Sequence, residues 1–489
     1  MSIMLYNSYA KGLQEFVPQN PPQVTMYTCG PTVYGRPHIG NYSSFLLADL
    51  LRRWLEVHGY DVKHVKNITD VGHLVADGEA GEDKIEKQAK AEKIAPLDIA
   101  QKYTDMYIDD ERQLGMLQPF ARPKASETIT EMIMMIEKLV DDGFAYETED
   151  GVYFSVEKFP KYGTLSGNTL DHLSAGARIA VDEKKKHPAD FALWKKLVGN
   201  NANHILQWLS PWGRGFPGWH IECSAMSTKF LGTTIDIHTG GEDNIFPHHE
   251  CELAQSECAS GQQFVRFWLH RRRIDIESEK GGGAAEGQKM SKSLGNMIVI
   301  PDIMAKGYHP LDLRYLLLSV HYRTRLKFSW KGLDDAHKAR RKVNEWMDEV
   351  HAKHPADPAS PVTLPRAGKS KIHDCAVRFR EAMDDDLNTS GALAAVFDAM
   401  SWSRTQTMWS PEEADMLVAF LHVVRHTFGC FEVAAVPEPM PAAVTELAAQ
   451  RVQAKAAKNF AESDRLRDEI KKLGYEVRDA AGGQTVKKL

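Results

Sequence analysis

The sequence predicts an α/β fold built on a parallel sheet, followed by a mainly helical region and a small C-terminal module. Three observations lead to this prediction. Residues 24–31 (VTMYTCGP) form a short apolar strand pattern that ends in a Gly-Pro turn. Apolar residues then recur at helical spacing from Phe45 to Trp54, and Gly59 ends the run. Residues 62–71 (VKHVKNITDV) read as a second strand, so the order strand, loop, helix, strand opens a parallel α/β sheet.

The other elements are predicted in chain order from the same kinds of pattern. They are long amphipathic helices over 83–145, a strand pair over 142–156, a later strand of the main sheet at 233–240, a flexible loop at 278–288, helices from about 310 to Phe428, a proline-rich linker at 436–443, one helix over 444–473 closed by Gly474, and a hairpin around Gly482-Gly483.

Bulk composition narrows the class of protein. The chain has 489 residues, of which 43% are hydrophobic and 26% charged, so we expect a globular protein of about three domains. No apolar run approaches the roughly 18 residues of a membrane span, and the N-terminus lacks the pattern of a secretory signal. Six cysteines in so long a chain indicate a reducing cytoplasm and not a disulfide scaffold. The net charge of −6 excludes a uniformly basic surface but allows local nucleic-acid patches.

Two separate stretches suit a phosphate group. Residues 30–41 (GPTVYGRPHIGN) lie between a strand and the start of a helix, where backbone N–H groups and the helix dipole favour an anion. Residues 288–296 (QKMSKSLGN) carry two lysines just beyond the predicted loop, and such lysines can stabilise charge on a transferred phosphate. Each stretch alone is more simply a turn or a solvated surface.

Residues 236–255 (DIHTGGEDNIFPHHECELAQ) gather histidines, acids and a cysteine around a glycine pair. Zinc usually takes four ligands from Cys, His, Asp and Glu. His248 and Glu252 are four apart, on one face of a predicted helix, and two thiolates would complete the set. Cys29 and Cys223 are candidates because parallel strands bring their carboxyl ends together. The residues alone favour the simpler alternative of buried core thiols beside a helix cap, since there is no Cys-x-x-Cys pair.

Taken together, HIGN and KMSKS resemble the signature pair of the class I aminoacyl-tRNA synthetases. Asn41 stands where the family's motif has a second histidine. The resemblance implies a Rossmann-like catalytic domain that binds ATP, with magnesium, and an amino acid. It implies that His38 and Lys292 are catalytic and act on the triphosphate. The residues that it implies for ATP binding are His38, Gly40, Asn41, Gly241, Asp243, Lys289 and Lys292.

Longer stretches resemble the cysteinyl-tRNA synthetase family over nearly the whole chain. They include the Cys before GPTVY, DFALWKK, SPWGRGFPGWHIECSAM, FPHHECE, HYRTRLKFSW and DDDLNTSGALAAVFD. The resemblance implies one zinc ion per chain, and it leaves His249, Glu250 and Cys251 as neighbours of the ligands. The implied zinc ligands are Cys29, Cys223, His248 and Glu252, and the implied substrate-binding residues are Thr69, Trp219 and His238.

The implied reaction joins L-cysteine to tRNA(Cys) at the expense of ATP, through cysteinyl-adenylate and with release of pyrophosphate. The expected parts are a catalytic domain over 1–310 with a connective insertion at about 100–190, a stem-contact and helical-bundle region over 311–436, and an anticodon-binding module over 444–489. The C-terminal stretch 441–489 holds ten Lys/Arg against seven Asp/Glu. A cytoplasmic monomer without a membrane partner is expected. Residues at about 71–83 and 271–287 look like loop insertions relative to many family members.

Three alternatives stay open at this point. The first is an ATP-dependent cysteine ligase that acts on an amino-sugar, although relatives of that kind lack the long C-terminal region. The second is a non-catalytic RNA-binding paralogue, which would have lost the signature residues. The third is a side activity in persulfide formation with pyridoxal phosphate, at the KIEK lysines (Lys84, Lys87) and the KMSK lysines (Lys289, Lys292), although lysines in a helical charge run are more often plain surface.

Overall fold

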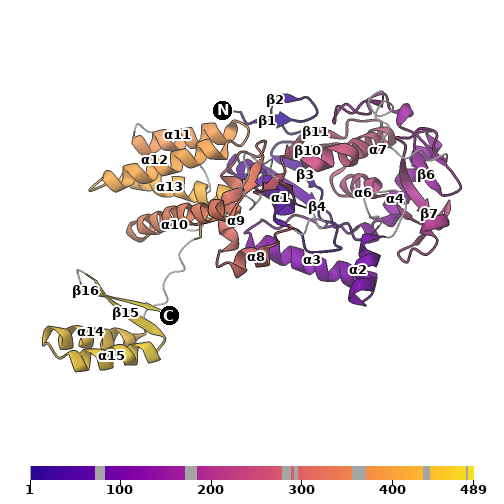
Figure 1. The fold of residues 1–489 in the computed structure, drawn as a ribbon. Helices are drawn as coiled ribbons and strands as arrows, with labels where there is room; N and C mark the ends of the chain where they lie inside the picture. The colour runs from indigo at the N-terminus through magenta and orange to yellow at the C-terminus, as the bar shows by residue number, and fades with distance from the viewer. Residues whose placement is uncertain are drawn as a thin grey trace. The chain divides into compact units, whose positions relative to one another are not determined.

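The computed structural model describes residues 2–71, 83–170, 184–277, 288–290, 296–354, 370–432, 441–480 and 483–488. The chain divides into two compact units, Met1–Glu432 and Val433–Leu489. Figure 1 labels their helices and strands.

A parallel sheet forms the centre of the first unit. Its order is β11-β10-β3-β4, and every neighbouring pair in it runs parallel. This confirms the parallel α/β sheet predicted from the sequence. Its strands are β3 (Gln23–Thr28), β4 (Asp61–Lys66), β10 (Ile235–Gly241) and β11 (Val265–Arg271).

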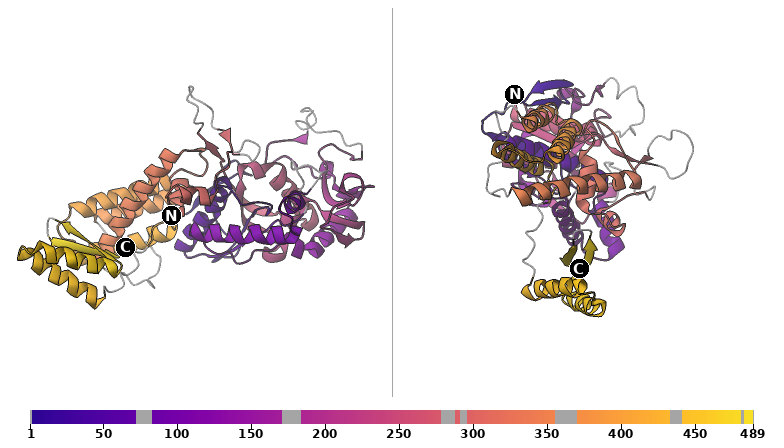
Figure 2. Two further views of the ribbon diagram at one scale, coloured as in Figure 1. Left: turned by 60° about the horizontal axis from the view of Figure 1, so that its bottom comes forward. Right: turned by 90° about the vertical axis from the view of Figure 1, so that its left-hand side faces the viewer.

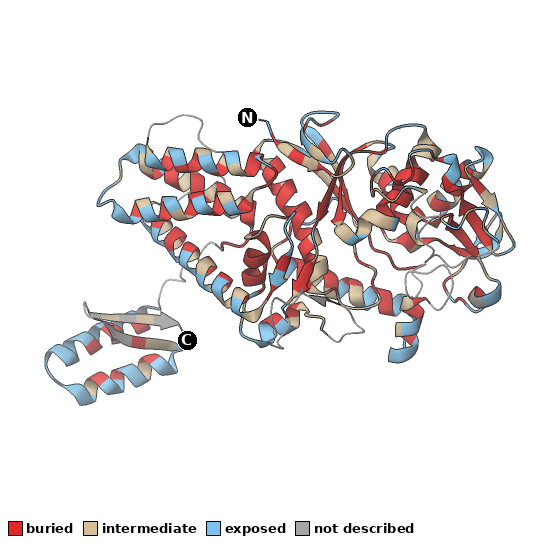
Figure 3. Ribbon diagram, turned by 45° about the horizontal axis from the view of Figure 1, so that its top comes forward, coloured by how far each residue is buried: buried red, intermediate tan, exposed pale blue. Residues whose placement is uncertain are grey.

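Helices cover both faces of this sheet (Figure 1). Two neighbouring residues of β3 show that both faces are covered, because Met26 belongs to one hydrophobic core and Tyr27 to the other. Side chains alternate across a strand, so both faces are buried, as a parallel sheet requires. Figure 3 shows buried residues along the strands and the helix faces that cover them. The covering helices are α1 (Ile39–Val57) with the first core, and α4 (Ile129–Asp141), α6 (Trp219–Leu231) and α7 (Glu250–Ser260) with the second.

The segment between β4 and α6 carries helices and a separate antiparallel sheet of order β5-β6-β7-β9-β8. The strand pair predicted over 142–156 is present as β5 and β6. The elements are α2 (Lys84–Glu92), α3 (Pro96–Gln113), β5 (Ala145–Glu147), β6 (Gly151–Phe154), β7 (Phe191–Lys196), β8 (Trp208–Ser210) and β9 (Gly213–Pro217).

Short strands and a helical bundle complete the first unit. Strand β14 interrupts the region predicted to be helical from 310 to Phe428, because it pairs in parallel with β12. The bundle packs on the same hydrophobic core as α1. The elements are β1 (Met4–Asn7), β2 (Gly12–Glu15), β12 (Ile274–Ile276), β13 (Gln288–Lys289), β14 (Leu326–Phe328), α8 (Ile300–Ala305), α9 (Pro310–Leu318), α10 (Trp330–Lys353), α11 (Lys371–Asp384), α12 (Thr389–Thr405) and α13 (Pro411–Phe428).

A buried charge network ties α1 to the bundle. Asp49 accepts hydrogen bonds from Arg53 Nε at 2.8 Å, Arg314 Nη2 at 2.6 Å and the backbone N–H of Leu117 at 2.7 Å. Arg314, from α9, donates in turn to the carbonyl of Phe428 at 2.5 Å, where α13 ends. Three parts of the chain therefore meet on one carboxylate.

A second junction joins two of the stretches that resemble the family. Asp386, in DDDLN, accepts from Tyr322 Oη at 2.5 Å and from Arg323 Nε at 2.6 Å, both in HYRTR. It also accepts from the backbone N–H of Tyr6 at 2.8 Å. Asp386 has φ 54° and Leu387 has φ 56°, so these contacts hold two non-glycine residues in the left-handed region.

The second unit is a helix pair packed on a hairpin, as the views in Figure 2 show. The predicted hairpin is confirmed, with β15 (Tyr475–Ala480) antiparallel to β16 (Gly483–Lys488). The single helix predicted over 444–473 is wrong, because the structure has α14 (Ala442–Ala456) and α15 (Phe460–Lys472). Lys458 has φ 57°, which ends α14, and the Asn459 side chain accepts from the N–H of Glu462 to start α15.

Two further predictions fall partly on undescribed residues. Of the loop at 278–288 only Gln288 is described, and of the linker at 436–443 only the last three residues are, two of them already in α14. In the described part of the chain, no helix is long and apolar enough to cross a membrane.

Candidate active site

The segment predicted to bind phosphate leads from β3 into α1. His38 is the N-cap of α1, and its Nδ1 accepts a hydrogen bond from the N–H of Gly40 at 3.0 Å. Asn41 Oδ1 accepts from the N–H of His38 at 3.0 Å. The two side chains form a reciprocal cap, so Asn41 has a structural task at the position where the family's motif has histidine. The positive end of a 19-residue helix faces this segment.

The structure brings the HIGN and KMSKS segments together. A Cβ built on Gly40 would lie 3.0 Å from Met290 Cε, so the end of the Met290 side chain lies against the backbone of Gly40. Lys289 lies in β13 opposite Asp275 of β12. Lys292 is outside the described residues.

Gly40→Ala should impair the use of ATP more than it impairs folding. The new methyl group would lie 2.8 Å from His38 Cε1, so the imidazole, which is a movable side chain, must shift. Misplacement of a catalytic side chain by about 1 Å costs about a hundredfold in rate, and His38 is the residue expected to act on the triphosphate. We therefore expect kcat/KM for ATP in ATP–pyrophosphate exchange to fall about a hundredfold. Gly332→Ala is the control, since its methyl group would meet only Ser329 Oγ at 3.3 Å. An unchanged kcat/KM in Gly40→Ala would contradict this account.

The end of β10 carries the two residues expected to hold the ribose. Gly241 is the last residue of β10, and a Cβ there would lie 3.0 Å from Ser44 Oγ of α1. Asp243 follows in the short helix Glu242–Asn244. Both residues therefore lie at the carboxyl edge of the parallel sheet, beside the start of α1.

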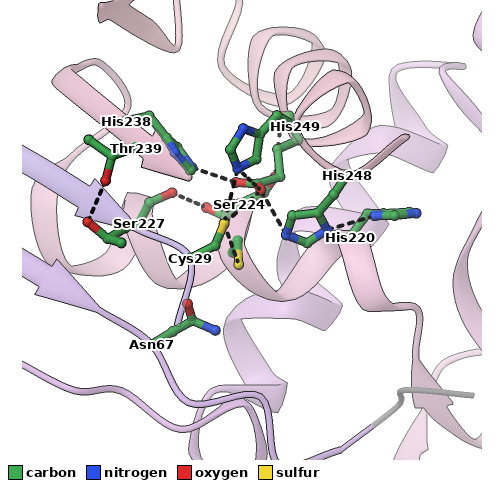
Figure 4. A network of polar contacts seen from close by, with 12 residues as sticks. Cys29, Asn67, His220, Ser224, Ser227, His238, Thr239, His248 and His249 are labelled. Carbon is green, nitrogen blue, oxygen red and sulfur yellow. Dashed lines mark hydrogen bonds and ion pairs between the residues drawn. The ribbon is translucent and has the colours of Figure 1, made fainter. Parts of the chain in front are cut away.

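The four residues predicted to bind zinc come together from three parts of the fold. Cys29 follows β3, Cys223 lies in the second turn of α6, and His248 and Glu252 flank the start of α7. One donor atom from each lies within 4.8 Å of the other three. Figure 4 shows Cys29, His238, His248 and His249 turned toward a common centre.

Individual contacts within the cluster are short. Cys29 Sγ lies 3.7 Å from Cys223 Sγ and 3.4 Å from Glu252 Oε1. His248 Nε2 lies 3.0 Å from the same Glu252 oxygen, and His238 Nε2 lies 3.0 Å from the other one. All five of these residues are buried.

The electrostatics of the cluster favour an anion on two of the predicted ligands and oppose one on Cys29, because burial, Cys223 and Glu252 hold the pKa of the Cys29 thiol well above its ordinary value. Burial opposes ionisation of Cys223, but the hydrogen bond from Cys29 and the charge of His248 lower its pKa to about 6. Burial likewise opposes ionisation of Glu252, but His238 and His248 hold its pKa well below the usual range. Glu252 and Cys223 outweigh the effect of burial on His248 and raise its pKa to about 10. Negative charge therefore gathers on Cys223 and Glu252, where a cation would be stabilised.

Sequence reasoning missed a chain of histidines around the cluster. His248 Nδ1 lies 2.9 Å from His220 Nδ1, and His249 Nδ1 lies 2.7 Å from His270 Nε2. His249 also forms a second donor group with Cys29, His238 and Glu252. That His249 is a neighbour and not a ligand stays a prediction. Knowledge of how β11 pairs with β10 would have identified His270, because this residue lies near the end of β11, directly opposite Gly240.

The other two residues set aside as neighbours point away from the cluster. Glu250 accepts from the N–H groups of Gly163 at 2.9 Å and Ser166 at 2.8 Å. Cys251 Sγ lies 3.6 Å from Tyr162 Oη. Both side chains therefore attach α7 to the antiparallel-sheet region.

The three residues expected to bind the substrate lie around the same cluster. Trp219 stacks on His248, with ring centroids 4.4 Å apart. His238 contacts Glu252 and stacks on Trp268 at 4.6 Å. Thr69 is buried and accepts from Asn67 Nδ2 at 3.2 Å.

Glu222 is a buried acid that sequence reasoning also missed. It precedes Cys223 on α6, is fully buried, and neither carboxyl oxygen has a hydrogen-bond partner among the described residues. Burial raises its pKa well above the usual range, and the Thr69 hydroxyl group partly opposes this. Composition gave no signal for it, because GWHIECS does not show which way the acid points.

Gly30→Ala should disturb the cluster through the backbone. A Cβ on Gly30 would lie 1.7 Å from the carbonyl oxygen of Asn67, which cannot move without its strand. Overpacking of this kind costs about 1–3 kcal/mol, and Cys29 next to it would be displaced. We expect a lower melting temperature and a lower metal content. A variant with wild-type values of both would show that this close approach is unimportant.

Comparisons with known proteins agree with this arrangement. The profile described as the tRNA synthetases class I (C) catalytic domain matches residues 15–338, the DALR domain matches 378–432, and the cysteinyl-tRNA ligase anticodon binding domain matches 438–486. A methionyl-tRNA synthetase of Mycobacterium tuberculosis with bound methionyl-adenylate shares the fold, with a TM-score of 0.54 and 14% identity over 90% of this chain and 96% of that one. The catalytic fold is therefore that of the class I aminoacyl-tRNA synthetases.

Curated relatives narrow the class. A cysteine–tRNA ligase of Thermus thermophilus is 40% identical over 99% of this chain and 98% of its own length, and one of Chlorobium luteolum is also 40% identical, with the same two coverages. The chain belongs to the cysteinyl-tRNA synthetase family. An amino-sugar acceptor finds no support in these matches, since they include an anticodon-binding domain.

Proposed function

We propose that this protein activates L-cysteine with ATP and transfers it to the 3′ end of tRNA(Cys). The observation that carries the proposal is the cluster of two thiols, an imidazole and a carboxylate within 4.8 Å of one another. It lies at the same sheet edge as the segment that resembles a phosphate-binding loop. A donor set of this kind beside an ATP site suits a substrate that itself carries a thiol.

Cys29, Cys223, His248 and Glu252 are the residues that would hold zinc. Their chemistry fits the ion, because zinc binds Cys, His and carboxylate donors in sets of four. When bound, zinc supplies a borderline-soft centre that prefers a thiolate to the hydroxyl group of serine. A hydrophobic pocket alone separates such isosteres poorly.

The remaining proposed roles concern ATP, which would bring magnesium with it. His38 and the N-terminus of α1 would bind the phosphates, and Gly241 and Asp243 the ribose. Lys289 and Lys292 would stabilise negative charge on the phosphates during the reaction.

Activation needs no general base, because the carboxylate of cysteine is already ionised. It attacks the α-phosphate, the bond to the β-phosphate breaks, and pyrophosphate leaves with the electron pair. The protein then contributes by positioning and by charge stabilisation. A ribose hydroxyl of the tRNA attacks the resulting acyl-adenylate and releases AMP.

The second unit would read the anticodon. The match over 438–486 to a cysteinyl-tRNA ligase anticodon binding domain supports this role. Tyr475 at the start of β15 offers a ring for base stacking, and cationic residues around it offer contacts to phosphate. We expect a monomer that acts in the cytoplasm.

Charging of bulk tRNA tests the proposal. With ATP and magnesium, labelled cysteine should become attached to tRNA, and labelled serine should not. Charging with both amino acids would refute the proposed selection of the thiol. Consumption of ATP with cysteine, but without attachment to tRNA, would refute the proposed acceptor.

A further inference from the structure

The buried carboxyl group of Glu222 has no task in the fold that the described contacts reveal. Its side chain is fully buried, and neither oxygen has a hydrogen-bond partner among the described residues. An unsatisfied buried polar group costs about 1–3 kcal/mol of stability, so we expect the Glu222 carboxyl group to have a functional role.

Neighbouring acids do not share this property. Asp70 accepts from the N–H of Ser126 at 2.8 Å and from its hydroxyl group at 2.6 Å. Glu252 is bonded to His238 and His248. Of the acids around the cluster and the NITD turn in the described part of the chain, Glu222 is the one for which the Thr69 hydroxyl group is the only polar contact.

The surroundings of Glu222 define where it lies. It is adjacent to Cys223 in α6, and the charges of Cys223, Asp70 and His248 all act on it. Thr69 contacts it from the NITD turn. Glu222 therefore lies between the thiol cluster and Thr69, which is one of the residues expected to bind the substrate.

The chemistry of the substrate completes the argument, which rests on the proposed function. In L-cysteine three bonds separate sulfur from nitrogen, so a thiol held at the cluster keeps the ammonium group within a few ångströms of it. An ammonium group carries three N–H donors and needs acceptors when water is excluded. We propose that Glu222, with Thr69, binds the ammonium group of the amino acid substrate, and that its carboxyl group is ionised beside the bound ammonium group and accepts its N–H donors.

Substrate analogues that lack one group test this assignment. 3-Mercaptopropionate keeps the thiol and carboxylate but lacks the ammonium group, whereas cysteamine keeps the thiol and ammonium group. In Glu222→Gln, we expect KM for L-cysteine and Ki for cysteamine, measured by ATP–pyrophosphate exchange, to rise together by about tenfold to a hundredfold. Ki for 3-mercaptopropionate should stay within about twofold of the wild-type value, because the substitution does not change the groups that bind its thiol and carboxylate.

Two further variants and a metal assay make the result decisive. Glu131→Gln is the matched control, since Glu131 pairs with Lys229 at the far end of α6 at 2.6 Å, and none of the three constants should change. If Glu222→Gln does not fold, Glu222→Asp replaces it in the experiment. This variant keeps the carboxyl group but moves it back by one methylene group, and the same pattern of changes in the three constants is expected. Zinc content should equal that of the wild type.

Equal shifts for all three compounds would assign Glu222 a structural role and overturn the inference, and so would unchanged constants for all three. If the wild-type protein shows no exchange with cysteine at all, the proposed function itself has failed. That outcome is distinct, because it does not involve the variant.

Discussion

Replacement of Cys223 by alanine should remove both the proposed zinc ion and the activation of cysteine. Structural zinc in four-ligand sites contributes roughly 10–16 kcal/mol, so one ligand of four accounts for a loss of about a hundredfold to a thousandfold in affinity. The substitution removes a sulfur atom that lies within 4.8 Å of the donor atoms of Cys29, His248 and Glu252. Metal content by mass spectrometry and ATP–pyrophosphate exchange with cysteine measure the two effects.

Cys251→Ala is the control for this experiment. Cys251 is equally buried and lies on the same helix as Glu252, but its sulfur contacts Tyr162 and belongs to neither donor group. We expect it to keep its zinc and its exchange activity. A Cys223→Ala protein that keeps a full complement of zinc would show that the predicted ligand set is wrong.

Replacement of Asp49 by alanine should cause a large loss of stability in the first unit. Arg314 is fully buried and Arg53 is 7% exposed, and both donate to the Asp49 carboxylate. Loss of one partner leaves buried guanidinium groups uncompensated, which costs about 3–5 kcal/mol. Urea unfolding followed by tryptophan fluorescence should show a lower midpoint. Arg341→Ala, which breaks an exposed pair with Glu345, should cost less than about 1 kcal/mol.

The same carboxylate should make stability depend on acid pH. Burial opposes its ionisation, but Arg314 and Arg53 lower the pKa of Asp49 below its ordinary value. A lowered pKa stabilises the folded state above about pH 4, the ordinary value of Asp, and that stability is lost as the pH falls toward the folded pKa. Asp49→Ala should therefore lose less stability than the wild type between about pH 5 and pH 3. Parallel losses in both proteins would contradict this assignment.

Local patterns were enough to predict much of the fold. The strand at 24–31, the helix ended by Gly59 and the hairpin at Gly482-Gly483 rest on periodicity and turn chemistry, and the structure has all three. The break between α14 and α15 was missed because Lys458 adopts a positive φ where the sequence has no glycine. Asn459 followed by Glu462 was the available signal, since this spacing is typical of a helix start.

The candidate site was harder to predict from residues alone. Composition favoured core thiols for Cys29 and Cys223, and the ligand set came from resemblance to a family. These two cysteines are 194 residues apart in the sequence, and only the parallel sheet and α6 bring them together, which no local pattern encodes. Glu222, His220 and His270 were missed for the same reason, because their roles depend on which side chains face them.

Spectroscopy of the cobalt-substituted protein tests the central claim most directly, namely that the cluster holds a metal that binds the substrate's thiol. Cobalt(II) accepts the same donors as zinc, and each coordinated thiolate adds to its sulfur-to-metal charge-transfer absorption. Addition of L-cysteine should increase this absorption with saturation, and L-serine should leave it unchanged. An identical response to both amino acids, or none to cysteine, would contradict the account.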